Sequence, residues 1–194
     1  MTHIRVNPES VQAYGRHAQA QFEQMHQALV DLVNDVVNVQ YFGPNAVAFK
    51  TECGQIAAAF AGALHLDMAA FADAVRASTS NIAAALGGAP IVIQLDNRAI
   101  TPPTPATVDF VDVDTAALEA LVPVVTTRFG ALRASLQSNM NQLNGTDWQG
   151  NAKLSAMDAV ASFTGKANTK CDQAETELNS FITAQVNSVV LADR

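Results

Sequence analysis

Apolar residues recur every three or four positions along most of this chain, and this spacing constrains its fold more than any other feature. Side chains spaced in this way share one face of an α-helix and favour packing against other helices. The pattern begins after Asn7-Pro8-Glu9, a segment typical of a helix N-terminus. Its first stretch contains Val11, Tyr14, Ala18, Phe22, Met25, Leu29, Leu32, Val36 and Val39. The sequence therefore predicts an all-α protein.

An aromatic-x-Gly step interrupts the pattern twice, at Tyr41-Phe42-Gly43 and at Trp148-Gln149-Gly150. Pro44 follows the first step, and proline can begin a helix but cannot continue the hydrogen bonding of a preceding one. Asn144-Gly145, just before the second step, is a strong turn signal. Each break is predicted to join two helices into a hairpin, so the two halves of the chain repeat one plan.

The ends of the remaining helices also have recognisable signals. The second helix is predicted over about 45–86, where Gly87-Gly88 is a common way to end a helix. The third begins at the N-cap Asp114 and contains Pro123, which is expected to kink it or to delay its start. The fourth is predicted over about 151–190.

A change of composition separates the two hairpins. Thr101-Pro102-Pro103-Thr104-Pro105 cannot be helical, while Ile91-Val92-Ile93 can form a short extended piece. The predicted organisation is therefore a first hairpin over 1–88, a linker over 89–113 and a second hairpin over 114–194.

The length of this linker predicts how the hairpins pack. Parallel hairpins would need only a few connecting residues. Helices of about 30–40 residues span roughly 45–60 Å, and about 25 extended residues can reach roughly 80–90 Å. The linker thus favours an elongated, antiparallel four-helix bundle. The alternative is a flexible tether between independent hairpins, which would expose large apolar stripes.

Two cysteines, Cys53 and Cys171, lie far apart in the sequence. We expect both to be reduced core residues, because buried cysteine behaves as a small apolar side chain. In the antiparallel bundle their offset along the axis is expected to be about five residues, or roughly 7 Å. A disulfide stays possible at that offset, provided that the Cβ atoms are close and correctly aimed.

The net charge and the first residues of the sequence indicate which partners the protein can bind and by which route it could leave the cell. The net charge is −7 with 11 basic residues, and these do not cluster, so neither nucleic acid nor an anionic membrane is the expected partner. No run reaches the roughly 18 uninterrupted apolar residues that a membrane span requires. The start, Met1–Val6, lacks the apolar region of a Sec signal peptide. The protein is expected either to stay in the cytoplasm or to leave by a route that needs no cleaved leader.

No pattern of residues predicts catalysis, a cofactor or a metal site. The histidines, at positions 3, 17, 26 and 65, lack metal-ligand spacing. Asp109, Asp112 and Asp114 resemble a calcium loop superficially, but the glycine and the bidentate terminal acid are missing. Neither a nucleophile elbow nor a phosphate-binding loop is present. The sequence therefore predicts a non-enzymatic protein without cofactors.

The first break carries a family resemblance. Its residues 41–49, Tyr-Phe-Gly-Pro-Asn-Ala-Val-Ala-Phe, resemble the W-x-G-x-x-A-x-x-F signature of the WXG100 (ESAT-6-like) family, with Tyr41 in place of tryptophan. The second break carries W-x-G literally at Trp148–Gly150, with Ala156 at the downstream aromatic position. Each half of about 80–90 residues resembles one family member. The resemblance covers nearly the whole chain except the linker.

This resemblance implies both a fold and a function. Family members are helical hairpins that dimerise antiparallel, and this chain looks like such a dimer fused into one polypeptide. They are exported folded and without a cleaved leader by a type VII (ESX) secretion system. The implied partners are the secretion ATPase or a co-secreted helical protein, and the implied state is a monomer as pseudo-dimer or a homodimer. Tyr41, Gly43, Trp148 and Gly150 are then candidate export-recognition residues as well as structural caps of the bundle.

The chain departs from the family pattern at its C-terminal end. Export in the family also uses a Tyr-x-x-x-Asp/Glu motif after the last helix, read together with the partner's turn. Here Phe181 is followed four positions later by Gln185, and no such motif occurs nearby. The antiparallel bundle would place this end near Tyr41–Gly43. An intracellular helical adaptor or chaperone-like protein is the alternative function.

Overall fold

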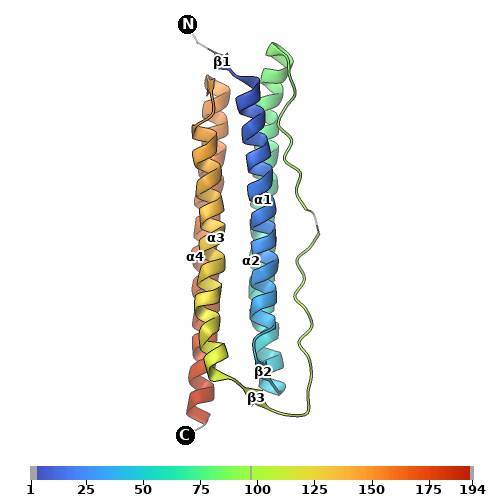
Figure 1. Ribbon diagram of the computed structural model, residues 1–194, viewed down its shortest axis with the longest axis vertical. Coiled ribbons are helices and arrows are strands. Elements are labelled where there is room, and N and C mark those ends of the chain that lie inside the picture. Colours follow the sequence, from blue (N-terminus) through green and yellow to red (C-terminus); the bar gives the residue numbers. More distant parts are fainter. Residues whose placement is uncertain (1–3, 97, 193–194) are drawn as a thin grey trace. The chain divides into compact units, whose positions relative to one another are not determined.

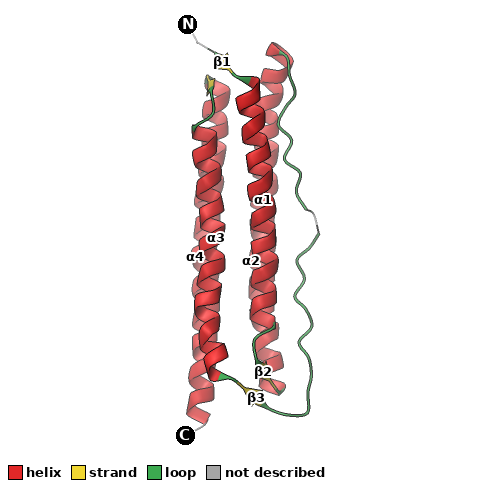
Figure 2. Cartoon of the chain, in the orientation of Figure 1, coloured by secondary structure: helices red, strands yellow, loops and turns green. Residues whose placement is uncertain are grey.

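The computed structural model of this chain describes residues 4–96 and 98–192, apart from the side chains of Ala85 and Leu86. The described part is all-α, as predicted, and Figure 2 shows how little of its regular structure is strand. Its helices are α1 (Pro8–Val37), α2 (Pro44–Leu86), α3 (Thr115–Asn144) and α4 (Asn151–Ala192), labelled in Figure 1. They form two helical hairpins, α1–α2 and α3–α4, of a four-helix bundle, so the predicted fold class is confirmed.

Pro123 lies inside α3, which already begins at Thr115. The expectation that this proline delays the start of the helix is therefore wrong. Asp114 caps the helix by accepting hydrogen bonds from the backbone N–H groups of Ala116 and Ala117, at 2.9 and 3.1 Å. This N-cap holds the first turn in place well before the proline is reached.

Four two-residue strands flank the helices, and the sequence did not reveal them. They are β1 (Arg5–Val6), β2 (Tyr41–Phe42), β3 (Asp112–Val113) and β4 (Trp148–Gln149). β1 pairs antiparallel with β4, and β2 pairs antiparallel with β3. The segment that leads into each hairpin is thus paired with the turn of the other hairpin. These pairings are those of antiparallel hairpins, which is the packing that the linker length predicted.

The two halves repeat each other at a constant interval. Pro8 and Thr115, which begin α1 and α3, are 107 residues apart. The same interval separates β1 from β3, β2 from β4, and the start of α2 from the start of α4. The N-caps match as well. The Asn7 side chain accepts hydrogen bonds from the backbone N–H groups of Glu9 and Ser10, and Asp114 caps α3 in the same way. The chain is therefore an internal duplication in structure as well as in sequence.

Contacts along the chain define two compact units, and neither of them coincides with a hairpin. The first comprises Met1–His26, Leu64–Asn97 and Arg133–Thr169, and the second comprises Gln27–Ala63, Arg98–Leu132 and Lys170–Arg194. Each unit therefore contains a part of all four helices.

Aromatic side chains join the helices within each unit. In the first unit Phe22, Phe71 and Phe163 contact one another from α1, α2 and α4, with ring centroids 5.1–5.7 Å apart. In the second unit Phe60 of α2 contacts Phe129 of α3 at 5.1 Å. Edge and offset ring contacts of this kind add to the free energy gained from apolar burial.

The linker is packed against the first hairpin in both units. In the first unit Ile91 and Ile93 are buried while Val92 is exposed, an alternation typical of extended chain. Gly15 of α1 makes room for Ile91, because a Cβ there would lie 2.9 Å from its Cγ2. In the second unit Gly54 of α2 receives Pro102 in the same way. In the described residues the linker therefore packs along the first hairpin, and the alternative of a flexible tether between independent hairpins is wrong.

Two described helices, α2 over Pro44–Ala84 and α3, are long and apolar enough to cross a membrane by length and composition alone. Core helices of bundles pass the same test, and both helices bury aromatic residues, such as Phe60 and Phe129. The lack of a membrane span stays a prediction from the sequence.

Candidate functional site: the two aromatic-x-Gly turns

Both turn glycines adopt a left-handed backbone conformation, with φ of +117° at Gly43 and +119° at Gly150. Residues with a Cβ rarely adopt this conformation, so glycine is needed at each turn, as expected. Gly43 has a second reason, because the linker crosses directly over it. A Cβ on Gly43 would lie 3.1 Å from Cγ2 of Val111 and 3.5 Å from the backbone oxygen of Phe110.

The aromatic residue of each turn is buried and not exposed to solvent. Tyr41 is 4% exposed and Trp148 is 2% exposed. The Tyr41 ring lies 5.9 Å from that of Phe49, and burial raises the pKa of its hydroxyl. These positions suit the predicted caps of the bundle, while recognition by an export machinery stays a prediction.

The expectation that the Trp148 indole N–H finds a partner at the turn is wrong. Its buried Nε1 has no acceptor among the described residues. The backbone N–H of Trp148 instead bonds to the oxygen of Thr146 at 2.9 Å. The turn is therefore closed by its main chain, and the indole ring contributes apolar burial.

The late part of α4 meets the first turn. Gln185 Nε2 donates to the Tyr41 hydroxyl oxygen at 2.9 Å, and Phe181 stacks on Phe49 at 5.5 Å with only 7° between the rings. The end of α4 thus lies at Tyr41–Gly43, as the antiparallel arrangement predicts.

The side chains around the first turn form an aromatic cluster with a buried cation beneath it. The rings of Phe42 and Phe110 lie 5.9 Å apart, and Lys50 Nζ lies 4.9 Å from the centroid of Phe42. Lys50 is 6% exposed, and burial lowers the pKa of its ammonium group. A cation over an aromatic face is stabilised by the ring quadrupole, which partly replaces lost hydration.

Polar contacts hold the second turn. Arg5 pairs with Asp147 at 3.2 Å, and the backbone N–H of Asp147 donates to the Ser10 hydroxyl at 2.9 Å. Lys153 Nζ donates to the backbone oxygens of Asn144 and Thr146, at 3.0 and 2.8 Å. Lys153 thus satisfies the carbonyl of the last residue of α3 and one carbonyl of the turn that follows, and a lysine bonded to a terminal carbonyl is a common feature of helix ends.

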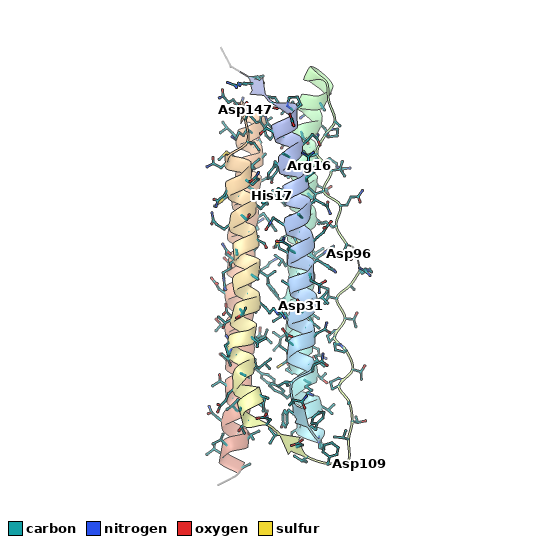
Figure 3. All side chains as sticks on the ribbon, in the orientation of Figure 1. Arg16, His17, Asp31, Asp96, Asp109 and Asp147 are labelled. Atoms are coloured by element: carbon teal, nitrogen blue, oxygen red, sulfur yellow. The ribbon has the colours of Figure 1, made fainter. Side chains whose placement is uncertain are left out.

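The described histidines and carboxylates that were weighed as metal ligands do not gather into a metal site. No group of three or more His, Cys, Asp and Glu in the described part of the chain is placed to hold a metal ion. His17 hydrogen-bonds Ser138 at 3.1 Å and His26 lies 3.5 Å from Asp96 (Figure 3). His3 lies outside the described residues.

Cys53 and Cys171 are fully buried and neither is in a disulfide, as expected. Their axial offset of about five residues stays a prediction. Burial, followed by the charge of Glu52, raises the pKa of the Cys53 thiol to about 12.

Comparison with family models, curated proteins and solved structures gives no match to this chain. The assignment to the WXG100 family stays a prediction that rests on the motif and the duplication.

The sequence reasoning missed Phe42, Lys50, Phe110 and Val111, which gather at the first turn. The residue types were visible in the sequence, but their proximity was not, because Phe110 and Val111 belong to the linker. A residue-by-residue comparison of the two halves would have found the difference, since Gln149 stands where the first half has Phe42.

Proposed function

We propose that this protein is a non-enzymatic, ESAT-6-like protein that acts through protein–protein binding and is exported by a type VII (ESX) secretion system. The observation that carries the proposal is the duplicated turn. Two aromatic-x-Gly steps, 107 residues apart, each lie between long helices and each pair with the entry strand of the other half. A fused dimer of WXG100-like hairpins accounts for this arrangement.

The proposed partners are the membrane ATPase of that system and a co-secreted helical protein. The given sequence contains no Tyr-x-x-x-Asp/Glu, the motif that the family uses for export, and Phe181 and Gln185 of α4 instead contact Phe49 and Tyr41. We therefore propose that the chain travels with a substrate that carries the motif, and that it reaches the outside of the cell without cleavage of a leader.

Export can be tested in the native host by quantitative immunoblotting. The protein is expected in the culture supernatant of the wild type, and in the cell pellet alone when the ESX ATPase gene is deleted. A lysis marker in both fractions controls for leakage. If the wild-type supernatant lacks the protein while total amounts are equal in both strains, export is ruled out.

An intracellular adaptor is the second candidate, and the lack of a Tyr-x-x-x-Asp/Glu motif in the given sequence favours it. It predicts a purely cytosolic pool and co-purification with one helical client.

A further inference from the structure

Exposed apolar side chains gather at the corner where the linker crosses the first turn. Phe110 is 56% exposed and Val111 is 74% exposed, while Phe42 beside them is half-buried. Figure 3 shows Asp109 at the bend where the linker turns towards α3. Contact with water at adjacent apolar side chains costs free energy, and covering them with apolar atoms of a partner would recover it.

The second half of the chain shows that the fold requires neither the ring of Phe42 nor the cation of Lys50 at a turn of this kind. Its turn has the same strand pairing and the same left-handed glycine, yet Gln149 stands at the position of Phe42. Likewise Met157 stands at the position of Lys50. Since the same backbone forms without the aromatic ring or the cation, packing alone does not explain their presence at the first turn.

Two carboxylates flank Phe110 and Val111 in the sequence. Asp109 and Asp112 are exposed, and neither forms a hydrogen bond or an ion pair through its side chain among the residues that the structure describes. Asp114, in contrast, is occupied in capping α3. The residue equivalent to Asp112 in the other half is Arg5, so the negative rim also belongs to the first turn alone.

We infer that this acidic aromatic corner, made of Phe42, Phe110, Val111, Asp109 and Asp112, docks a protein segment that presents apolar side chains flanked by Lys or Arg. Apolar contact would supply the affinity, and opposite charge would select the partner and speed the encounter. A second copy of this chain would bring the same carboxylates together, and an anionic lipid surface would be repelled. The inference rests on the protein–protein binding of the proposed function and not on export.

Site-specific photocrosslinking in the native host tests the inference. A benzoylphenylalanine replaces Phe110 in one strain and Ile4 in a control strain. Ile4 is the equivalent of Val111 at the other turn and is 60% exposed, so the two probes are equally accessible. We expect one crosslinked protein from position 110 and none from position 4. The crosslinked segment, sequenced by mass spectrometry, is expected to contain apolar residues with at least two Lys or Arg.

The same segment, made as a synthetic peptide, then gives the affinity. Binding to the full chain is expected to weaken at least ten-fold in Phe110→Ser and in the double variant Asp109→Lys/Asp112→Lys, and to be unchanged in Ile4→Ser. Circular dichroism confirms that each variant is folded. Crosslinks to a second copy, to lipid or to an acidic segment, equal labelling at both positions, or no crosslink at all would overturn the inference. Loss of export with an intact crosslink would refute only the secretion proposal.

Discussion

Equivalent positions in the two halves separate the side chains that the fold requires from those that it tolerates. Gly43 and Gly150 share a left-handed conformation, and Asn7 and Asp114 share a capping role. Phe49, in contrast, is matched by Ala156, although both are buried. Backbone geometry at the turns is therefore specified by residue type, while the core beneath them accepts different volumes when its neighbours adjust.

Gly43 offers a direct test of the turn. Replacing it with alanine would place a Cβ at φ +117° and 3.1 Å from Val111 Cγ2. The free energy of unfolding, measured in urea, is expected to fall by about 1–3 kcal/mol. Gly62→Ala is the control, because Gly62 lies inside α2 with nothing within 4 Å of a new Cβ. This variant is expected to gain about 0.5–1 kcal/mol. Equal stability of the two variants would contradict the role given to the turn glycine.

Cys53 predicts a dependence of stability on alkaline pH. Its thiol pKa is raised from 9.0 to about 12 in the folded protein, so the unfolded chain loses this proton first. The stabilisation by the protonated thiol is complete below pH 9 and is lost as the pH rises towards 12. The slope is about −1.4 kcal/mol per pH unit for one group. Urea unfolding between pH 9.5 and 11 should show a shallower slope for Cys53→Ala, and parallel slopes would show that the thiol ionises freely.

At the scale of elements, the linker behaves as part of the first hairpin. Gln19 of α1 holds it by two hydrogen bonds, donating from Nε2 to the backbone oxygen of Gln94 at 2.9 Å and accepting from its N–H at 2.7 Å. Gln12 adds a third bond to the backbone oxygen of Ala89 at 2.8 Å. A side-chain amide that pairs with a backbone amide imitates strand pairing where no strand is available.

Removing the two hydrogen bonds between the Gln19 side chain and the Gln94 backbone should loosen the linker without unfolding the helices. In Gln19→Ala, hydrogen exchange at the Gln94 amide is expected to rise at least ten-fold, while global stability falls by about 1 kcal/mol or less for each lost bond. Gln27→Ala is the matched control, since Gln27 bonds only Asp31 on its own helix, at 2.8 Å. Hydrogen exchange measured by mass spectrometry on linker peptides separates the two variants. An identical rise in the exchange rate in both would contradict the role given to the Gln19 hydrogen bonds.

At the scale of the whole molecule, the side chains that join the two hairpins differ between the repeats. Arg128 of α3 donates to Asp35 and Asp31 of α1 at 2.8 and 3.0 Å, and the hydrogen bond to Asp35 is the main cause of its raised pKa. The residue equivalent to Arg128 in the first half is Gln21, and the residue equivalent to Asp31 in the second half is Ser138. The ion pair of Arg128 with Asp31 and Asp35 can therefore form only when the first hairpin packs against the second, and not between two copies of one hairpin.

Cutting the chain tests this asymmetry. Two co-expressed fragments, ending at Ala106 and beginning at Thr107, divide the linker between exposed residues. Native mass spectrometry is expected to find a 1:1 complex, because each fragment alone leaves an apolar face uncovered and only the mixed pair forms the Arg128 ion pair. A substitution of Arg128 by glutamine should raise the share of homodimers several-fold. Homodimers as the main species of the unaltered fragments would contradict the proposed asymmetry.

Several features follow from the sequence because they depend on local chemistry. The spacing of apolar residues, Pro44 after the first turn and the cap at Asp114 were enough to place the helices within a few residues of their observed ends. The ring contacts between α2 and α4, such as Phe49 with Phe181 and Phe71 with Phe163, were beyond such reasoning. They depend on the axial position of one helix relative to the other, and that position is decided by how the side chains of both helices interlock.

Some properties of the two aromatic-x-Gly turns likewise follow from the sequence, and others follow only from the tertiary structure. Helix breaks, left-handed glycines and the repetition of one hairpin are local properties, so the sequence by itself determined them. Only the tertiary structure buried the ring of Tyr41 and brought Phe110 and Val111 over Gly43. Those contacts join residues about 70 positions apart, and no local preference specifies them. They arise when antiparallel packing forces the linker to return past the first turn.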